Sequence, residues 1–288
     1  MNNEKKIRLN FPIWLGGNNP VYKLGSDLLD FLAPKTEMEI IDIPVHENTI
    51  GVRIEDGMTE RSKVMTEFDT VSDVLSSKQP DKIIIFGGDC SCDFIPFAYL
   101  ADKYKDDYGI LWIDAHPDIQ TTEHYPNVHA HVLGALMGKG QDTDLLSRVP
   151  YYISPKKVMI AGSHSHSEYE KSFLQKHQVN LCSPEVVMDG TDSLVKWIKD
   201  NGIKHLAIHL DLDVLNEKKF KPLYLNNPNK NESDFDGIPR GKLDVEHVIK
   251  WVDAANKNAN VVGFGIAEHL PWEAMMMKEL LNSLSIIK

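Results

Sequence analysis

Short apolar runs recur along this chain, and longer stretches with helical spacing lie between them. The runs are rich in β-branched residues and do not alternate strictly, which is typical of strands buried on both faces. They are found at 7–14, 38–45, 82–86, 109–113, 157–161, 204–212 and 261–267. Helices are expected near 59–77, 92–105, 131–148, 190–201, 244–257 and 272–287. The alternation predicts an α/β fold with a parallel sheet, either open or closed into an eight-stranded barrel.

The alternation of strand and helix continues from end to end without a linker rich in Pro, Gly or Ser. We therefore expect a single domain over residues 1–288. Segment 216–242 departs from the pattern, because it is polar and rich in Asn, Pro and Gly. A connection of this length in a compact domain is usually functional or mobile, but a tolerated surface insertion explains the sequence equally well.

Composition excludes several classes of protein. The net charge is −11, and there is no basic stripe, which argues against a nucleic-acid partner. No window approaches 18 consecutive apolar residues, so no membrane span is expected, and Met1 leads into a polar stretch that does not resemble a secretory leader. Three cysteines in 288 residues do not make a disulfide framework, and we expect a cytoplasmic protein.

Four of the predicted strands end in side chains that can bind metal or transfer protons. These side chains are Cys90, Asp114, His116, Asp118, Asp211, Asp213 and Glu268. Because the carboxyl ends of parallel strands meet at one edge of a sheet, the four strands would deliver these groups to one place.

The carboxylates among them require a cation. Asp114, His116 and Asp118 alternate just past one strand and Asp211 and Asp213 do so at the end of another, so each set points to one side. Carboxylates that converge in this way repel one another unless a cation lies between them, and oxygen ligands with one nitrogen suit divalent manganese, with cobalt, zinc or iron as alternatives. Two cations could hold a bridging hydroxide as nucleophile.

Four short motifs together resemble the ureohydrolases, the group that contains arginase, agmatinase and formimidoylglutamase. They are Gly-Gly-Asp-Cys-Ser at 87–91, Trp-Ile-Asp-Ala-His-Pro-Asp at 112–118, His-Leu-Asp-Leu-Asp at 209–213 and Ile-Ala-Glu at 266–268. The resemblance implies a three-layer α/β/α fold with an eight-stranded, mostly parallel sheet. It further implies a binuclear manganese centre, a cytoplasmic location and a homo-oligomer, either a trimer or a hexamer.

The resemblance also implies the ligands of each metal ion. The first ion would be held by Cys90, Asp114, Asp118 and Asp211, and the second by Asp114, His116, Asp211 and Asp213. The family most often has histidine where Cys90 stands, and a softer thiolate brings Zn²⁺, Fe²⁺ or Co²⁺ into consideration beside Mn²⁺.

The same resemblance implies three catalytic roles and a reaction. Asp118 would orient the hydroxide, His129 would shuttle protons and Glu268 would pair with the guanidinium of the substrate. The reaction implied is hydrolysis of a C–N bond in a small linear guanidine or amidine.

Some positions differ from the arginine-specific pattern of the family. Gln120 stands where an asparagine contacts the substrate carboxylate, Asn216 stands where an aspartate is usual, and residues 163–166 replace a pattern with two aspartates. His166 cannot attract an ammonium group, so the substrate is expected to differ from L-arginine in its tail, with segment 216–242 as the wall for that tail.

Two other functions remain open on the sequence. The chain could be a non-catalytic or altered-metal relative that kept the fold, but retaining so many acidic side chains argues against it. It could also be an amide hydrolase similar to the single-metal deacetylases, for which fewer bridging carboxylates are expected.

Overall fold

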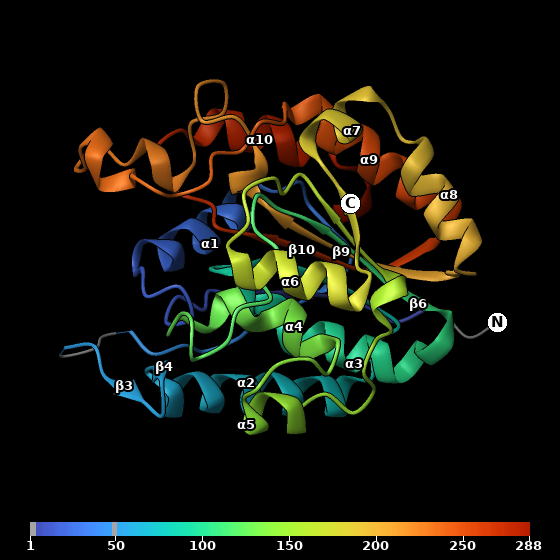
Figure 1. Ribbon diagram of the computed structural model, residues 1–288, viewed down its shortest axis with the longest axis horizontal. Helices are drawn as coiled ribbons and strands as arrows, with labels where there is room; N and C mark the ends of the chain where they lie inside the picture. The colour runs from blue at the N-terminus through green and yellow to red at the C-terminus, as the bar shows by residue number, and fades with distance from the viewer. Residues whose placement is uncertain (1–3, 48–50) are drawn as a thin grey trace.

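An open sheet of eight parallel strands runs through the middle of the molecule (Figure 1), in a computed structural model that describes residues 4–47 and 51–288. The strand order is β2-β1-β5-β10-β9-β6-β7-β8, and every pairing in this sheet is parallel. The strands are β1 (Lys6–Phe11), β2 (Glu39–Asp42), β5 (Lys82–Gly87), β6 (Tyr108–Ile113), β7 (Val158–Ala161), β8 (Asn180–Cys182), β9 (His205–Asp211) and β10 (Asn260–Ala267). The sheet has two free edges, β2 and β8, so the open alternative is the correct one.

Helices cover both faces of the sheet and bury two separate apolar cores (Figure 1). One layer contains α2 (Arg61–Lys78), α3 (Phe94–Tyr104), α4 (Val132–Leu136), α5 (Thr143–Ser147) and α6 (Glu168–His177). The other contains α1 (Val21–Leu32), α7 (Pro184–Asp189), α8 (Asp192–Asp200), α9 (Val245–Asn258) and α10 (Ala274–Ser283). The predicted three-layer α/β/α fold is confirmed.

The central strands show why their sequences do not alternate between polar and apolar residues. Along β9, Ala207 belongs to one core while Leu206 and Ile208 belong to the other, and all three are fully buried. Helices on both faces exclude water from both sides of the strand, so both sets of side chains must be apolar.

The helix expected over 131–148 is wrong, because this stretch forms the two short helices α4 and α5. Gly138, at a φ of 67°, lies just beyond α4, and its N–H donates to the carbonyl of Ala135. A left-handed glycine at this position ends a helix.

Several elements were not predicted from the sequence. They are α1, α6, α7, the edge strand β8 and an antiparallel pair formed by β3 (Ile54–Glu55) and β4 (Met58–Thr59). Strand β8 has only three residues and its Leu181 is exposed, so its sequence carries little of the apolar signal of a central strand.

Segment 216–242 is a compact loop whose ends lie together. A parallel bridge between Leu215 and Leu243 closes its base, and Phe220, Leu223 and Phe235 are buried. It contains the 3-10 turns Tyr224–Asn226 and Glu232–Phe235. A loop that packs on its own side chains in this way has a defined shape, unlike a loose insertion.

Within the described ranges, no helix is both long and apolar enough to cross a membrane.

Candidate metal centre

The four strands that carry the predicted site are neighbours at the centre of the sheet, in the order β5-β10-β9-β6. Their register is level at the carboxyl ends, since Ala267 lies opposite Asp211, and Ile113 lies opposite Leu210. Strands β5 and β6 follow one another in the chain, but β10 and β9 lie between them in the sheet. In open α/β sheets, ligands bind in the crevice at the carboxyl ends of the strands where the strand order reverses.

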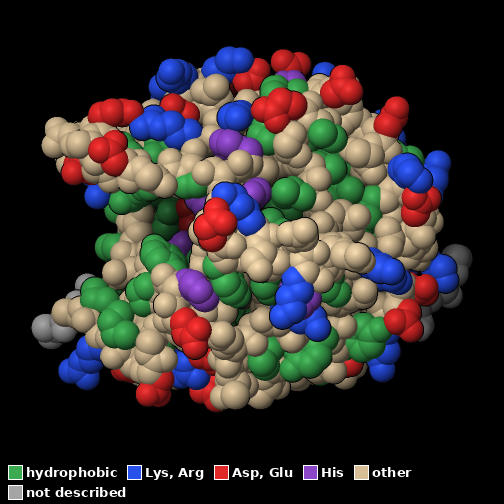
Figure 2. Space-filling model, in the orientation of Figure 1, with side chains coloured by type: hydrophobic (Ala, Val, Ile, Leu, Met, Phe, Trp, Pro, Cys, Tyr) green, Lys and Arg blue, Asp and Glu red, His purple; other side chains and the backbone are tan. Residues whose placement is uncertain are grey.

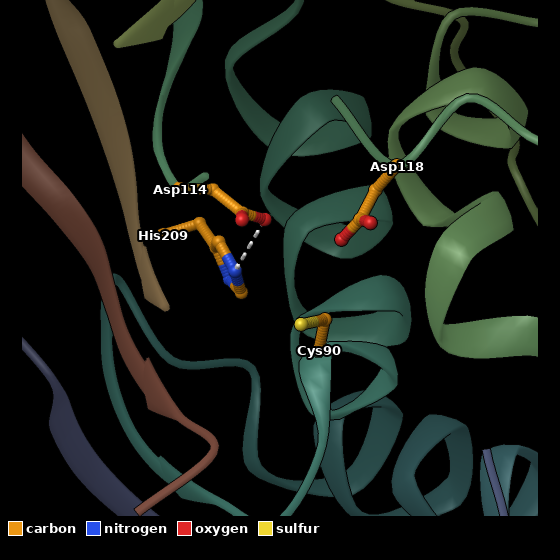
Figure 3. Close-up of side chains that lie close together, drawn as sticks. All are labelled: Cys90, Asp114, Asp118 and His209. Carbon is orange, nitrogen blue, oxygen red and sulfur yellow. Dashed lines mark ion pairs between the residues drawn. The ribbon is translucent and has the colours of Figure 1, made fainter. Parts of the chain in front are cut away.

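Donor atoms from these strand ends form three groups, and within each group they all lie within 4.8 Å of one another. The groups are Cys90, Asp114, Asp118 and His209; Cys90, Asp211 and Glu268; and Asp114, His116 and Asp213. The structure thus brings together all six predicted metal ligands, and it adds His209. Figure 3 shows the side chains of the first group converging from different elements.

The turn after β5 places Cys90 at the start of a 3-10 helix, Cys90–Asp93. Asp89 caps this helix by accepting a hydrogen bond from the N–H of Ser91 at 3.0 Å. A Cβ on Gly88 would lie 1.8 Å from the carbonyl oxygen of Ile13, so only glycine allows this close approach. The Cys90 thiol donates to Asp211 Oδ2 at 3.0 Å, which puts the sulfur among the acidic groups.

Local hydrogen bonds fix the acidic groups that follow β6 and β9. Asp114 Oδ1 accepts from the N–H of His116 at 2.6 Å, and Trp112 Nε1 donates to its other oxygen at 2.9 Å. Asp211 Oδ1 accepts from the N–H of Asp213 at 2.7 Å in the same way. His116 Nδ1 lies 2.9 Å from Asp213 Oδ2, which joins the two strand ends.

Two of the predicted catalytic residues have left-handed backbone conformations. The φ angles of Asp118 and Glu268 are 47° and 61°, values that residues other than glycine rarely adopt. Neighbouring backbone holds both in place: the carbonyl of Asp118 accepts from two N–H groups of the chain at 133–134, and the N–H of Glu268 donates to Gly88 at 2.7 Å. Such conformations are concentrated at functional sites.

The acidic groups are buried without cationic side chains to balance them. Among the described residues, no lysine or arginine forms an ion pair with Asp114, Asp118, Asp211, Asp213 or Glu268.

Burial and mutual repulsion shift the pKa values of these groups. Burial, and then the neighbouring carboxylate of Asp213, raise the pKa of Asp211 well above its usual range and that of Glu268 to about 8. Burial also raises the pKa of Asp118 well above its usual range, with Asp114 as the next cause. At Asp213 burial acts in the same direction, but the charge and hydrogen bond of His116, together with hydrogen bonds from the Ala115 N–H and Asp114, lower the pKa on balance.

The donor set fits divalent cations. It offers carboxylate oxygens, imidazole nitrogens and one sulfur, and two of its buried atoms, Asp118 Oδ2 and His209 Nε2, have no hydrogen-bond partner. Buried polar atoms without a partner are costly, and a bound cation would satisfy them and offset the repulsion between the carboxylates.

The remaining predicted catalytic residues are Glu268, which belongs to the second donor group, and His129. Glu268 accepts a hydrogen bond from the hydroxyl of Tyr22 at 2.6 Å, a contact between residues far apart in the chain that was not predicted. His129 lies outside the three donor groups. Its Nδ1–H donates to the carbonyl of Gly16 at 2.8 Å, which leaves Nε2 as the acceptor nitrogen in the neutral ring.

The residues that depart from the arginine-specific pattern have partners of their own. Gln120 Nε2 donates to Glu170 Oε1 at 2.8 Å, and His166 Nε2 lies 2.8 Å from the hydroxyl of Ser163. Asn216 accepts from the backbone N–H of Lys218 at 2.9 Å, in the loop and outside the donor groups.

His209 is the residue of the donor groups that sequence reasoning missed. Its spacing of two and four residues from Asp211 and Asp213 was the available signal, since alternate residues of a strand share a face.

Comparison with known proteins places this arrangement in one family. The sequence model of the Arginase family matches residues 31–220. The arginase of Saccharomyces cerevisiae is 35% identical over 216 residues, which cover 70% of this chain and 61% of the relative. The arginase of Entamoeba histolytica is 29% identical over 199 residues, which cover 67% of this chain and 66% of that one. The matched regions thus span less than two thirds of the relatives' own lengths.

The fold is also shared over nearly the full chain. The crystal structure of Entamoeba histolytica arginase in complex with L-ornithine superposes with a TM-score of 0.81 at 20% identity, over 99% of this chain and 97% of that one. Because the family's sequence model matches well over half of the chain and the fold agrees, the chain belongs to the arginase family.

Proposed function

We propose that the protein is a binuclear metal-dependent hydrolase that cleaves a C–N bond in a small linear guanidine or amidine. The observation that carries this proposal is the group of five carboxylates, buried except for the partly exposed Asp213, with Cys90 and His116, at the carboxyl ends of four central strands in a chain of the arginase family. Burying several carboxylates together is costly in folding free energy, and such clusters are concentrated at functional sites.

Two divalent cations would occupy the centre, with Mn²⁺ as the first expectation and Zn²⁺, Fe²⁺ or Co²⁺ as alternatives because of Cys90. The ligands proposed for one are Cys90, Asp114, Asp118 and Asp211, and those for the other are Asp114, His116, Asp211 and Asp213. When bound, the cations supply Lewis acidity and a water of lowered pKa at neutral pH.

The side chains of this site would bind the substrate and handle its protons. Glu268 would accept two N–H groups of the planar guanidinium or amidinium, a pairing in which Tyr22 already orients the carboxylate. Asp118 would accept a hydrogen bond from the attacking water. His129, with Nδ1 held by Gly16, would take up a proton on Nε2 from solvent and pass it to the leaving amine.

Tail recognition is proposed to differ from that of L-arginine. Gln120 donates an amide N–H to Glu170 at the position where an arginine carboxylate would need a donor. His166, which pairs with Ser163, is not an acidic group that could attract an α-ammonium. Figure 2 shows a hollow on one side of the molecule, beneath the lobe that residues 216–242 form in Figure 1. That loop is joined to the segment after Glu268 by a hydrogen bond from Leu270 N–H to the carbonyl of Pro222. This contact supports its role as the wall of the tail pocket.

We further propose one catalytic domain over residues 1–288, a homo-oligomer of three or six copies, and a cytoplasmic location. The assembly is proposed on the family resemblance, and sedimentation of the purified chain would test it. The location is supported by the three cysteines, all unpaired and buried, as in a reducing compartment.

The test is a screen of the full chain, stripped of metal and reloaded separately with Mn²⁺, Co²⁺, Fe²⁺ or Zn²⁺. Release of urea or ammonia is measured from L-arginine, agmatine, guanidino acids and formimino compounds, and bound metal is counted. We expect about two metal ions per chain and turnover of a guanidine or amidine other than L-arginine.

Each other result has a defined meaning. Preference for L-arginine over every other compound would overturn the tail assignment and leave the reaction class intact. Two bound metal ions with no turnover of any guanidine or amidine would favour the non-catalytic relative. One metal ion with amide cleavage would favour the deacetylase-like alternative.

A further inference from the structure

His209 is buried in the middle of the sheet with one ring nitrogen unpartnered. The side chain is fully buried, and Nε2 has no hydrogen-bond partner. The nearest acidic atom to it is Asp114 Oδ2 at 3.9 Å, which is too long for a hydrogen bond. Figure 3 shows this nitrogen on the side of the ring that faces Asp114 and Cys90.

Two neighbours fix the orientation of the His209 ring. Trp112, its partner across the sheet on β6, stacks on the imidazole with ring centroids 3.6 Å apart and planes 12° apart. Asp93 Oδ2 lies 2.7 Å from Nδ1 and accepts its proton. The Nδ1–H tautomer of neutral histidine leaves a lone pair on Nε2, the form in which an imidazole ligates metal.

The space for Asp93 comes from a glycine on the other neighbouring strand. Gly265 is the partner of His209 on β10, and a Cβ at this position would lie 2.0 Å from both carboxylate oxygens of Asp93. Any larger residue would displace the carboxylate. A carboxylate that accepts a hydrogen bond from one ring nitrogen, and so leaves the other nitrogen free, orients metal-binding histidines in proteins.

The donors around this nitrogen match a four-coordinate ion. Sγ of Cys90, an oxygen each of Asp114 and Asp118, and a ring nitrogen of His209 all lie within 4.8 Å of one another. Ligands about 2.0–2.3 Å from a tetrahedral ion are separated by roughly 3.3–3.8 Å, so small side-chain movements would close the site. Asp211, the fourth ligand that the family pattern implies here, is not in this group.

We propose that His209 is a metal ligand and that Cys90, Asp114, Asp118 and His209 form a site with one sulfur, one nitrogen and two oxygen donors. Asp93 is its positioning residue. A thiolate and an imidazole favour Zn²⁺ or Co²⁺ over Mn²⁺, so this site is selective for such a cation. The inference deepens the proposed function by putting His209 in place of Asp211 as the fourth ligand of the first ion, while Asp211 stays a proposed ligand of the second. It rests on the proposed function only in assuming that a cation binds here.

The first experiment uses the unmodified chain, so that it does not depend on the folding of a variant. The metal-free protein is titrated with Co²⁺ and with Zn²⁺. We expect a thiolate-to-cobalt charge-transfer band. With one Zn²⁺ added per chain, so that His116 on a second ion does not contribute, X-ray absorption should show one sulfur and one imidazole on the same ion. Sulfur scattering without imidazole on that ion would overturn the assignment of His209.

Variants then measure what His209 and Asp93 contribute. His209→Gln removes the ligand and should weaken Zn²⁺ at the thiolate-containing site by at least about 10–100-fold, and Asp93→Asn should weaken it by about 10–100-fold. His205→Gln is the matched control, because His205 lies on the same strand and face at the opposite end and should leave affinity unchanged. Circular dichroism checks that each variant folds.

The outcomes separate this inference from the proposed function. If the chain hydrolyses a guanidine or amidine and His209→Gln binds Zn²⁺ like the wild type, the assignment of His209 is wrong and the function stands. If the sulfur and imidazole signals are both present and no substrate is turned over, the metal site stands and the proposed reaction fails.

Discussion

Asp211 is the residue on which most of the proposed chemistry converges. It is the last residue of β9 and accepts a hydrogen bond from the thiol of Cys90. It belongs to the same donor group as Cys90 and Glu268. Its pKa is raised well above the usual range by burial and then by Asp213, and a nearby cation would favour the ionised carboxylate. A residue with these neighbours contributes more to cation binding than to folding.

Replacing Asp211 with Asn should therefore remove metal and activity while the fold is retained. We expect loss of at least one metal ion per chain and a fall in turnover of more than about 100-fold, because the amide is a neutral and weaker ligand. Metal analysis and steady-state rates measure this. Asp189→Asn, at the exposed last position of α7, is the control. A D211N variant with two metals and wild-type turnover would refute the ligand assignment.

Among the elements, α6 connects a capping motif to the site. Ser167 accepts from the N–H of Glu170 at 3.3 Å, and the Glu170 carboxylate accepts from the N–H and hydroxyl of Ser167. The second carboxylate oxygen of Glu170 holds Gln120, in the chain just after Asp118. The N-terminus of this helix therefore helps to position the loop that carries a proposed metal ligand.

Ser167→Ala should cost about 1 kcal/mol of stability through loss of this cap. Urea unfolding at neutral pH measures the change in the free energy of unfolding. Ser165→Ala is the control, because Ser165 is exposed in the same loop. If both substitutions lower the free energy of unfolding equally, the capping box contributes no more stability than any exposed hydroxyl.

The loop over 216–242 is the second element with a functional prediction. Tyr224 in this loop packs edge-on against Phe235 with centroids 5.6 Å apart, so its ring has a fixed position. If the loop is the wall of the tail pocket, Tyr224→Ala should raise KM by about 10-fold with a smaller change in kcat, because ground-state and transition-state binding are lost together.

The substrate for this measurement is the best one found in the screen. Metal content should not change in the Tyr224 variant, and Tyr152→Ala, an exposed tyrosine that bonds the carbonyl of Leu146, is the control. A change in metal content with an unchanged KM would show that the loop supports the centre and does not contact substrate.

At the scale of the whole molecule, stability should depend on pH through a buried histidine outside the centre. Burial lowers the pKa of His131 to about 4, although a hydrogen bond to the carbonyl of Tyr125 opposes the shift. The unfolded chain, with a histidine pKa near 6.5, therefore binds the extra proton between these values. The contribution of His131 is fully present above about pH 6.5 and is lost as pH falls towards 4.

The comparison of wild type with His131→Gln isolates this contribution, because the acidic centre titrates in both. The stability advantage of the wild type should fall by about 1.4 kcal/mol per pH unit across this window. Denaturant unfolding in saturating metal between pH 4 and 7 measures it. A difference between the two proteins that stays constant over this range would contradict a neutral buried His131.

The sequence by itself determined the α/β class, the central strands and the convergence of acidic groups. Apolar runs without alternation require helices on both faces, and polar residues at the ends of parallel strands must meet at one edge. The family motifs are local in sequence, so their resemblance was visible without coordinates. These inferences depend on short-range patterns that packing does not override.

Only the tertiary structure decided the open sheet, the strand order and the surroundings of each donor. Strand order places β10 and β9 between β5 and β6, which makes Trp112 and Gly265 the neighbours of His209 and lets Asp93 reach it from the turn after β5. Tyr22 likewise reaches Glu268 from 246 residues away along the chain. Such contacts depend on which strands pair, and strand pairing is set by the packing of the whole chain.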